Sequence, residues 1–204
     1  MHVATPSMSP GKVLTYRSAK THRDTTAWLA MIIFLGSWGM LFGALFFVYG
    51  ALRSSAEVWP PMEYPELPLG LPTLNTIVVA LSSLSLHWGV KSLREGRSAR
   101  LGPALLLAAI LGTVFLVSQI MVWDTMNANG LSPASGGYGS TFFGLTWLHA
   151  AHVVVGVGAL YYLTIKAFQG YFKPASYLSV RLWSMYWHFV GVMWALMFLT
   201  VYIL

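Results

Sequence analysis

Five long apolar runs, free of charged residues, alternate with short polar segments along the chain. They cover residues 27–52, 71–90, 101–122, 139–165 and 182–204. Each run reaches the roughly 20 residues that a helix needs to cross a bilayer. The alternating pattern of membrane-barrel strands is absent, so the runs predict helices. The sequence therefore predicts an all-α integral membrane protein, a bundle of five transmembrane helices.

Basic residues are concentrated on one side of this five-span arrangement. Eleven of the twelve Lys and Arg residues lie in the segments 1–26, 91–100 and 166–181, and the remaining one is Arg53. Because positive charge accumulates on the cytoplasmic side of a membrane, we expect the N-terminus inside and the C-terminus outside. Residues 1–26 are interpreted as a basic cytoplasmic tail without a signal peptide, since they contain no short apolar run. Residues 27–204 are interpreted as the five-helix membrane domain.

The composition agrees with this class and excludes others. Hydrophobic residues make up 56% of the chain and charged residues 9%, whereas soluble domains carry about 25% charged residues. The net charge of +6 follows from the topology, and no basic patch with interleaved aromatic residues indicates nucleic-acid binding. The chain has no cysteine, which excludes disulfides, iron–sulfur clusters and thiolate-bridged copper centres.

Four histidines within the predicted spans are the candidate functional residues: His87, His149, His152 and His188. A polar side chain inside a membrane is costly and needs a partner. His149 and His152 fall on one helix face, about 60° and about 4.5 Å apart. They are candidates for haem or metal ligation, for proton transfer, or for hydrogen bonds that hold helices together.

These alternatives make different demands on the sequence. A b-type haem needs one histidine from each of two facing helices at one depth, but His152 falls near mid-membrane and His188 about 9 Å from the inner end. A dinuclear metal site or an unaided proton relay needs buried carboxylates, and no predicted span contains Asp or Glu. The third alternative is neutral imidazoles that bind hydroxyls, carbonyls or lipid headgroups. The hydroxyls considered as partners are Ser82, Ser83, Ser85, Ser140, Thr141 and Thr146.

Six short motifs follow one another along the apolar part of the chain, from Ala27 to Leu204. They are WPP at Trp59–Pro61, LPTLNT at Leu71–Thr76, SLREG at Ser92–Gly96, YGSTFF at Tyr138–Phe143, H-x-x-H-V at His149–Val153, and YWHF with a following Trp at Tyr186–Trp194. In this order and with these spacings, the chain resembles subunit III of the haem-copper terminal oxidases of the cytochrome c oxidase type. That family commonly has seven helices, and the chain resembles a shorter form with only the last five.

The resemblance implies a subunit without redox centres, with haem and copper held by partner subunits. The main partner would be the catalytic subunit I, with subunit II and phospholipids as further partners. Such a subunit helps sustain proton uptake in subunit I and slows inactivation during turnover. His149, His152 and His188 match family histidines that are structural and not metal ligands, and His87 is interpreted as structural or lipid-contacting. The implied location is the bacterial cytoplasmic (inner) membrane, in an aerobic electron transport chain.

The chain departs from the family at three acidic positions. The buried glutamate of the first of these helices falls at Trp38, in the sequence GSWGM. A second glutamate falls at about Val122, and an aspartate after YWHF falls at Gly191. These departures weigh against proton buffering by this chain and leave structural support and lipid organisation as the expected roles.

Two other functions remain open at this point. One is a subunit III-like accessory protein of a nitric oxide reductase, because the motifs do not separate it from an oxidase subunit. The other is a stand-alone haem b membrane protein or small carrier, which a Soret band in the purified chain would favour.

Overall fold

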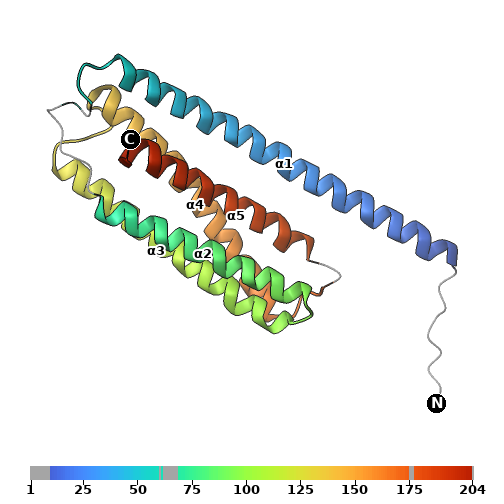
Figure 1. Ribbon diagram of the computed structural model, residues 1–204. Coiled ribbons are helices and arrows are strands. Elements are labelled where there is room, and N and C mark those ends of the chain that lie inside the picture. The colour runs from blue at the N-terminus through green and yellow to red at the C-terminus, as the bar shows by residue number, and fades with distance from the viewer. Residues whose placement is uncertain (1–9, 60, 62–68, 175–176, 204) are drawn as a thin grey trace.

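The structure is a computed structural model that describes residues 10–59, 61, 69–174 and 177–203. Within these residues the elements are all helical (Figure 1): α1 (Pro10–Ser55), α2 (Gly70–Arg94), the 3₁₀ turn η1 (Ser98–Arg100), α3 (Leu101–Ala128), α4 (Gly136–Phe168), α5 (Leu178–Met197) and the π-helical turn η2 (Phe198–Ile203). In the described part of the chain, five helices are long and apolar enough to cross a membrane. The predicted fold class is confirmed.

The helices extend beyond the apolar runs from which they were predicted. The first helix already begins at Pro10, so the part of the tail from residue 10 to residue 26 is helical, while residues 1–9 lie outside the described residues. Proline suits a first helical position, because the N–H that it lacks would have no partner there. Asp124, predicted to lie in a loop, is an exposed residue of the last turns of α3. An apolar run marks the lipid-facing length of a helix, whereas backbone hydrogen bonding continues into the polar region.

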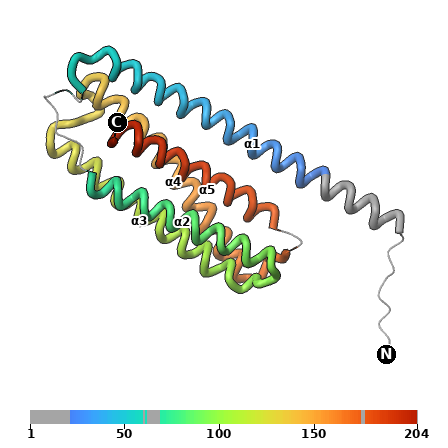
Figure 2. Tube along the Cα trace, in the orientation of Figure 1, coloured from blue at the N-terminus to red at the C-terminus, as the bar shows by residue number. Residues whose placement is uncertain are grey.

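The helices form a bundle in which α1 lies at the edge (Figure 2). The hairpin of α2 and α3 has the most extensive contact, and α4 and α5 connect it to α1. Only 6% of the most apolar stretch of α1 is buried, against 39–50% in the other four spans. One side of α1 therefore remains open along the membrane-crossing length.

The turns at one end of the bundle are closed by glycines. Gly96, in the SLREG motif, has φ +83° and donates its N–H to the carbonyl of Leu93, while Arg97 donates to Ser92. This is the Schellman arrangement that ends a helix, and only glycine adopts the left-handed conformation without strain. The connection of α4 and α5 lies at the same end (Figure 1). We call this end, which carries residues 91–100, 166–174 and 177–181, the basic end.

Tryptophan N–H groups tie neighbouring helices together. Trp187 and Trp194 on α5 donate to Ser82 and Thr76 on α2, at 2.9 and 3.0 Å. A buried indole N–H needs an acceptor, and a hydroxyl on the next helix supplies one without a charge. These bonds fix α5 against the α2–α3 hairpin at two depths.

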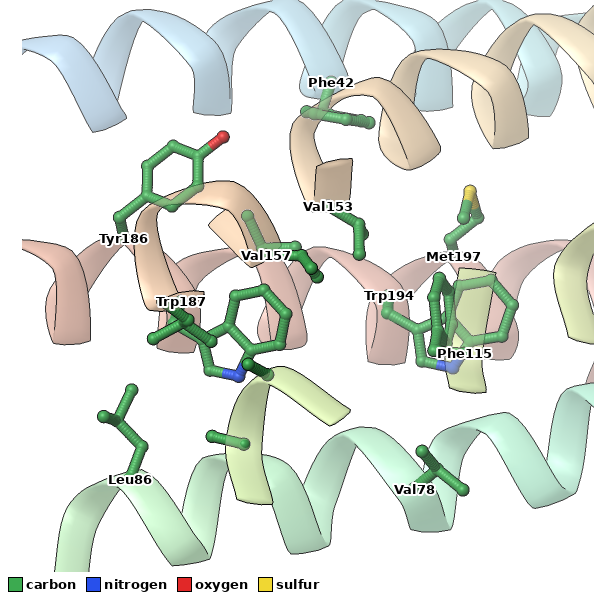
Figure 3. Packing of buried hydrophobic residues seen from close by; sticks show 14 of the residues in the cluster. Phe42, Val78, Leu86, Phe115, Val153, Val157, Tyr186, Trp187, Trp194 and Met197 are labelled. Carbon is green, nitrogen blue, oxygen red and sulfur yellow. The ribbon is translucent and has the colours of Figure 1, made fainter. Parts of the chain in front are cut away.

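The ring of Trp187 lies among buried side chains of neighbouring helices (Figure 3), in a space that two glycines leave free. A Cβ atom on Gly112 of α3 would lie 2.6 Å from the ring, and one on Gly156 of α4 would lie 2.8 Å from it. Both distances are too short for carbon atoms in contact, so neither glycine has room for a side chain. The three helices meet at this point because the two glycines make room for one indole.

Candidate functional site

His149 lies where four helices meet, and its ring is enclosed by aromatic side chains. Its side chain is 1% exposed. The rings of Phe42 on α1, Phe115 on α3 and Trp194 on α5 lie 6.3, 5.7 and 5.6 Å from it, centre to centre. Neither ring nitrogen has a hydrogen-bond partner within the described part of the chain. Aromatic packing is therefore what the structure provides around this imidazole.

His152, one turn further along α4, makes a local hydrogen bond. Its Nδ1 lies 2.6 Å from the carbonyl oxygen of Leu148. Because a carbonyl can only accept, Nδ1 carries the proton and donates. The ring of Trp38 on α1 stands edge-on to the imidazole, 3.8 Å between centres. Tyr186 on α5 donates to the backbone carbonyl of His152, at 3.0 Å.

His188 and His87 form a second pair nearer the basic end. His188 on α5 is half-buried and His87 on α2 is exposed, and the two lie close enough to interact electrostatically. The structure thus divides the four predicted residues into one pair within α4 and another pair between α5 and α2.

The space around His149 and His152 does not suit a haem. Axial ligation needs a flat gap between histidines from two facing elements. Both of these histidines belong to α4, and aromatic rings from α1, α3 and α5 fill the space that a porphyrin would need. The described residues also contain no group of three or more His, Cys, Asp or Glu side chains that could hold a metal ion. The arrangement favours the structural interpretation of the histidines.

Five of the six hydroxyls that were considered as partners of the histidines bind other groups. Ser82 accepts from Trp187 and donates to the carbonyl of Ala108, and Thr146 accepts from Trp123. Ser85 donates to the carbonyl of Ala104. Ser140 and Thr141 donate to the carbonyl of Gly137. In place of the expected histidine–hydroxyl pairs, Ser82 and Thr146 accept from tryptophan N–H groups, which need an acceptor when buried, and the other three hydroxyls donate to backbone carbonyls.

Sequence reasoning missed a buried polar group between α2, α3 and η2. Asn75 and Gln119 are each 1% exposed, and Ser118 donates to the side-chain oxygen of Asn75. The hydroxyl of Tyr202 lies beside the Gln119 amide. The sequence pattern could have indicated this group, because Asn75 and Gln119 interrupt apolar runs just as the histidines do.

At the three positions where the resemblance implies acids, the residues of this chain pack against neighbouring side chains. Trp38 is half-buried against His152, and Val122 is 0% exposed. A Cβ atom on Gly191 would lie 3.3 Å from Val79. In this chain each position serves a helix contact.

Comparison with known proteins places these features in a family. The model of the family described as "Cytochrome c oxidase subunit III" matches residues 15–204. A protein of Thermostichus vulcanus named "Cytochrome c oxidase subunit 3" is 29% identical over 197 residues, covering 96% of each chain. Proteins with the same name are 32% identical in Synechocystis sp., covering 85% of this chain and 74% of theirs, and 33% identical in Loxodonta africana, covering 84% and 67%.

Proposed function

The chain belongs to the cytochrome c oxidase subunit III family, and we propose that it stabilises the catalytic subunit of such an oxidase and organises bound lipid. Membership implies a multisubunit oxidase complex and a membrane location. In the proposal, haem and copper are held by partner subunits, with subunit I as the main contact and subunit II in the same complex. The chain itself contributes no catalytic residue. The expected location is the bacterial cytoplasmic membrane during aerobic electron transport.

The observation that carries the proposal is the character of the buried polar side chains. They are amides, hydroxyls and the two histidines of α4, and no Asp, Glu, Lys or Arg of the described residues is buried. Proton and ion pathways through membranes are normally marked by buried charged groups. The interior of this bundle is thus suited to holding a shape and not to moving charge.

The outer side of α1 supports an association role. It exposes large apolar side chains along its length, among them Ile33, Met40 and Phe47, which are 71, 79 and 77% exposed. Gly36, Gly43 and Gly50, spaced by seven residues, have no atom within 4 Å of an added Cβ. A helix face of this kind packs against lipid chains or against the helices of another membrane protein.

Deletion of the chain from its oxidase tests the proposal. We expect haem and copper to remain in the catalytic subunit at normal stoichiometry, because their ligands lie there. The remaining enzyme should lose activity faster during turnover and in detergent. Metal content, haem spectra and the decay of oxygen uptake measure both effects. Loss of a metal centre from an otherwise assembled enzyme would contradict the non-catalytic assignment.

A further inference from the structure

A pocket of about 470 Å³ lies at the basic end, between the last turns of α2 and the start of α3. Its volume is within the range of roughly 300–1,000 Å³ that is usual for small-molecule sites. The Schellman turn at Gly96 and the following turn η1 bring the two helix ends together. Gly89 of α2 approaches α3 so closely that an added Cβ would lie 2.7 Å from the Cβ of Ala104. Small residues therefore line the pocket where the two helices come close together.

Part of the lining of the pocket is positively charged. Lys91, Arg97 and Arg100 line it together with a single acid, Glu95. Glu95 is already engaged, because it pairs with Arg97. Lys91 and Arg100 have no ion-pair partner within the described part of the chain. The pocket thus presents two uncompensated cations, which favour an anion.

Another part of the lining is apolar, and exposed apolar residues continue from it along both helices. Trp88 of α2 and Leu107 of α3 line the pocket, and they are 63 and 49% exposed. From each of them a row of exposed apolar side chains continues at spacings of three and four residues, on the exposed side of its helix. The rows are Leu84, Leu81, Ile77 and Leu74 on α2, and Ile110, Val114, Val117 and Met121 on α3.

We propose that the α2–α3 pocket binds the phosphate headgroup of an anionic phospholipid, whose acyl chains lie along the exposed rows of α2 and α3. Basic pockets between membrane helices are suited to such headgroups. The phosphate would lie between Lys91 and Arg100, at the level of Trp88, where an aromatic ring is favourable at a membrane interface. The inference rests on the proposed role in organising lipid, and it names the site and the lipid class.

The test is a titration of the full-length chain in mild detergent with phosphatidylglycerol, or with neutral phosphatidylcholine, read by native mass spectrometry. We expect phosphatidylglycerol to bind at one lipid per chain in preference to phosphatidylcholine. The double variant Lys91→Gln, Arg100→Gln should bind it about 30-fold more weakly, the loss expected for two basic residues at a membrane surface. The matched control is Lys173→Gln, Arg181→Gln, which removes two exposed cations elsewhere at the basic end, one in the connection of α4 and α5 and one in the first turn of α5. It should bind within about threefold of the wild type.

Two further experiments distinguish lipid binding in the pocket from a general electrostatic attraction of the lipid to the basic end. Ser92→Trp keeps both cations but fills the pocket, so it should also weaken binding. Inorganic phosphate at millimolar concentration should not displace the lipid, because phosphate has no chains for the apolar rows. Equal losses in the two double variants, unchanged binding by Ser92→Trp, or displacement by phosphate would each overturn the proposal.

Co-purification of each variant with the catalytic subunit is a separate measurement. If Lys91→Gln, Arg100→Gln binds the lipid normally but loses the catalytic subunit, the pocket is a protein contact and the lipid assignment is wrong. If the wild-type chain binds phosphatidylglycerol as expected but never associates with an oxidase, the lipid site stands and the proposed function fails.

Discussion

The imidazole of His149 shows how a polar residue can serve as a packing group. Its ring contacts aromatic side chains from three other helices, while its two nitrogens lack partners in the described residues. A buried polar atom without a partner costs free energy, whereas an apolar group of the same shape does not. Mutation can therefore separate the contribution of shape at this position from that of polarity.

We expect His149→Leu to change the free energy of unfolding by less than about 1 kcal/mol, since volume and burial are kept. His149→Ala should cost about 2–5 kcal/mol, because it opens a cavity among the aromatic rings. Unfolding in mixed micelles, followed by circular dichroism, measures both values, with His22→Leu as the exposed control. If Leu proves as costly as Ala, the ring nitrogens have a partner and the packing interpretation of His149 is wrong.

The role of Trp38 can be tested by replacing it with Glu, the residue that the resemblance implies at this position. Its indole stands on the ring of His152, and Phe34 lies 5.8 Å from it. Trp38→Glu would replace these contacts by a carboxyl without a charged partner, which desolvation keeps largely neutral. We expect weaker association with the oxidase and no gain in protons pumped per electron, whereas Trp38→Phe should associate normally. Normal assembly with more efficient pumping would return a proton role to the subunit.

The candidate residues could be predicted from the sequence, but their partners could not. A histidine inside an apolar run is visible without a structure, and so is the expectation that it needs partners. Which hydroxyls are free depends on where the tryptophans point, and that follows from the crossing of α5 over α2. The sequence contains Trp187 and Ser82 more than 100 residues apart, and no local rule pairs them.

At the scale of elements, the contact of α3, α4 and α5 rests on the two glycines beside Trp187. Gly156 and Gly158 lie on the same helix, but only Gly156 has an occupied neighbourhood. Substitutions at these two glycines therefore compare a position in close contact with another helix with a position that has open space beside it.

Gly156→Ala should destabilise the bundle by about 1–3 kcal/mol, because its Cβ would overlap the indole of Trp187. Gly158→Ala should be neutral or stabilising by up to about 1 kcal/mol, since alanine favours a helix and nothing lies within 4 Å of its Cβ. Thermal unfolding of both purified variants decides the matter. Equal stability of the two variants would show that the three helices do not meet as described.

The number and type of the helices could be predicted, because length and hydrophobicity determine both. Their ends could not, since the helical part of the tail from Pro10 contains polar residues that the membrane does not select. The packing order also escaped prediction. Glycines four residues apart permit close helix contact, yet Gly39 has only ordinary contact with Phe189 and Gly43 has none within 4 Å.

At the scale of the whole molecule, the antiparallel bundle places residues 91–100, 166–174 and 177–181 at the basic end. Arg53 and the last turn of α1 lie at the other end. The orientation predicted from the charges would place the basic end in the cytoplasm.

Cysteine labelling tests the orientation without background, because the chain has no cysteine of its own. Ser54 and Ser98 are both exposed and lie at opposite ends of the bundle. In sealed cells, Ser54→Cys should react with a membrane-impermeant thiol reagent and Ser98→Cys should react only after lysis. Labelling of Ser98→Cys from outside would reverse the orientation.

The position of α1 at the edge of the bundle has a consequence for biosynthesis. Its contacts are with α4 and α5, and the roughly 100 residues between Phe42 and His149 take about 5–20 s to translate at about 5–20 residues per second. During that interval α1 lies in the bilayer without the two helices against which it packs, which its apolar length allows. Insertion of the first helix and its docking are therefore separate events. A substitution that harms only docking should leave a chain that is fully inserted, with α1 undocked and exposed to membrane proteases.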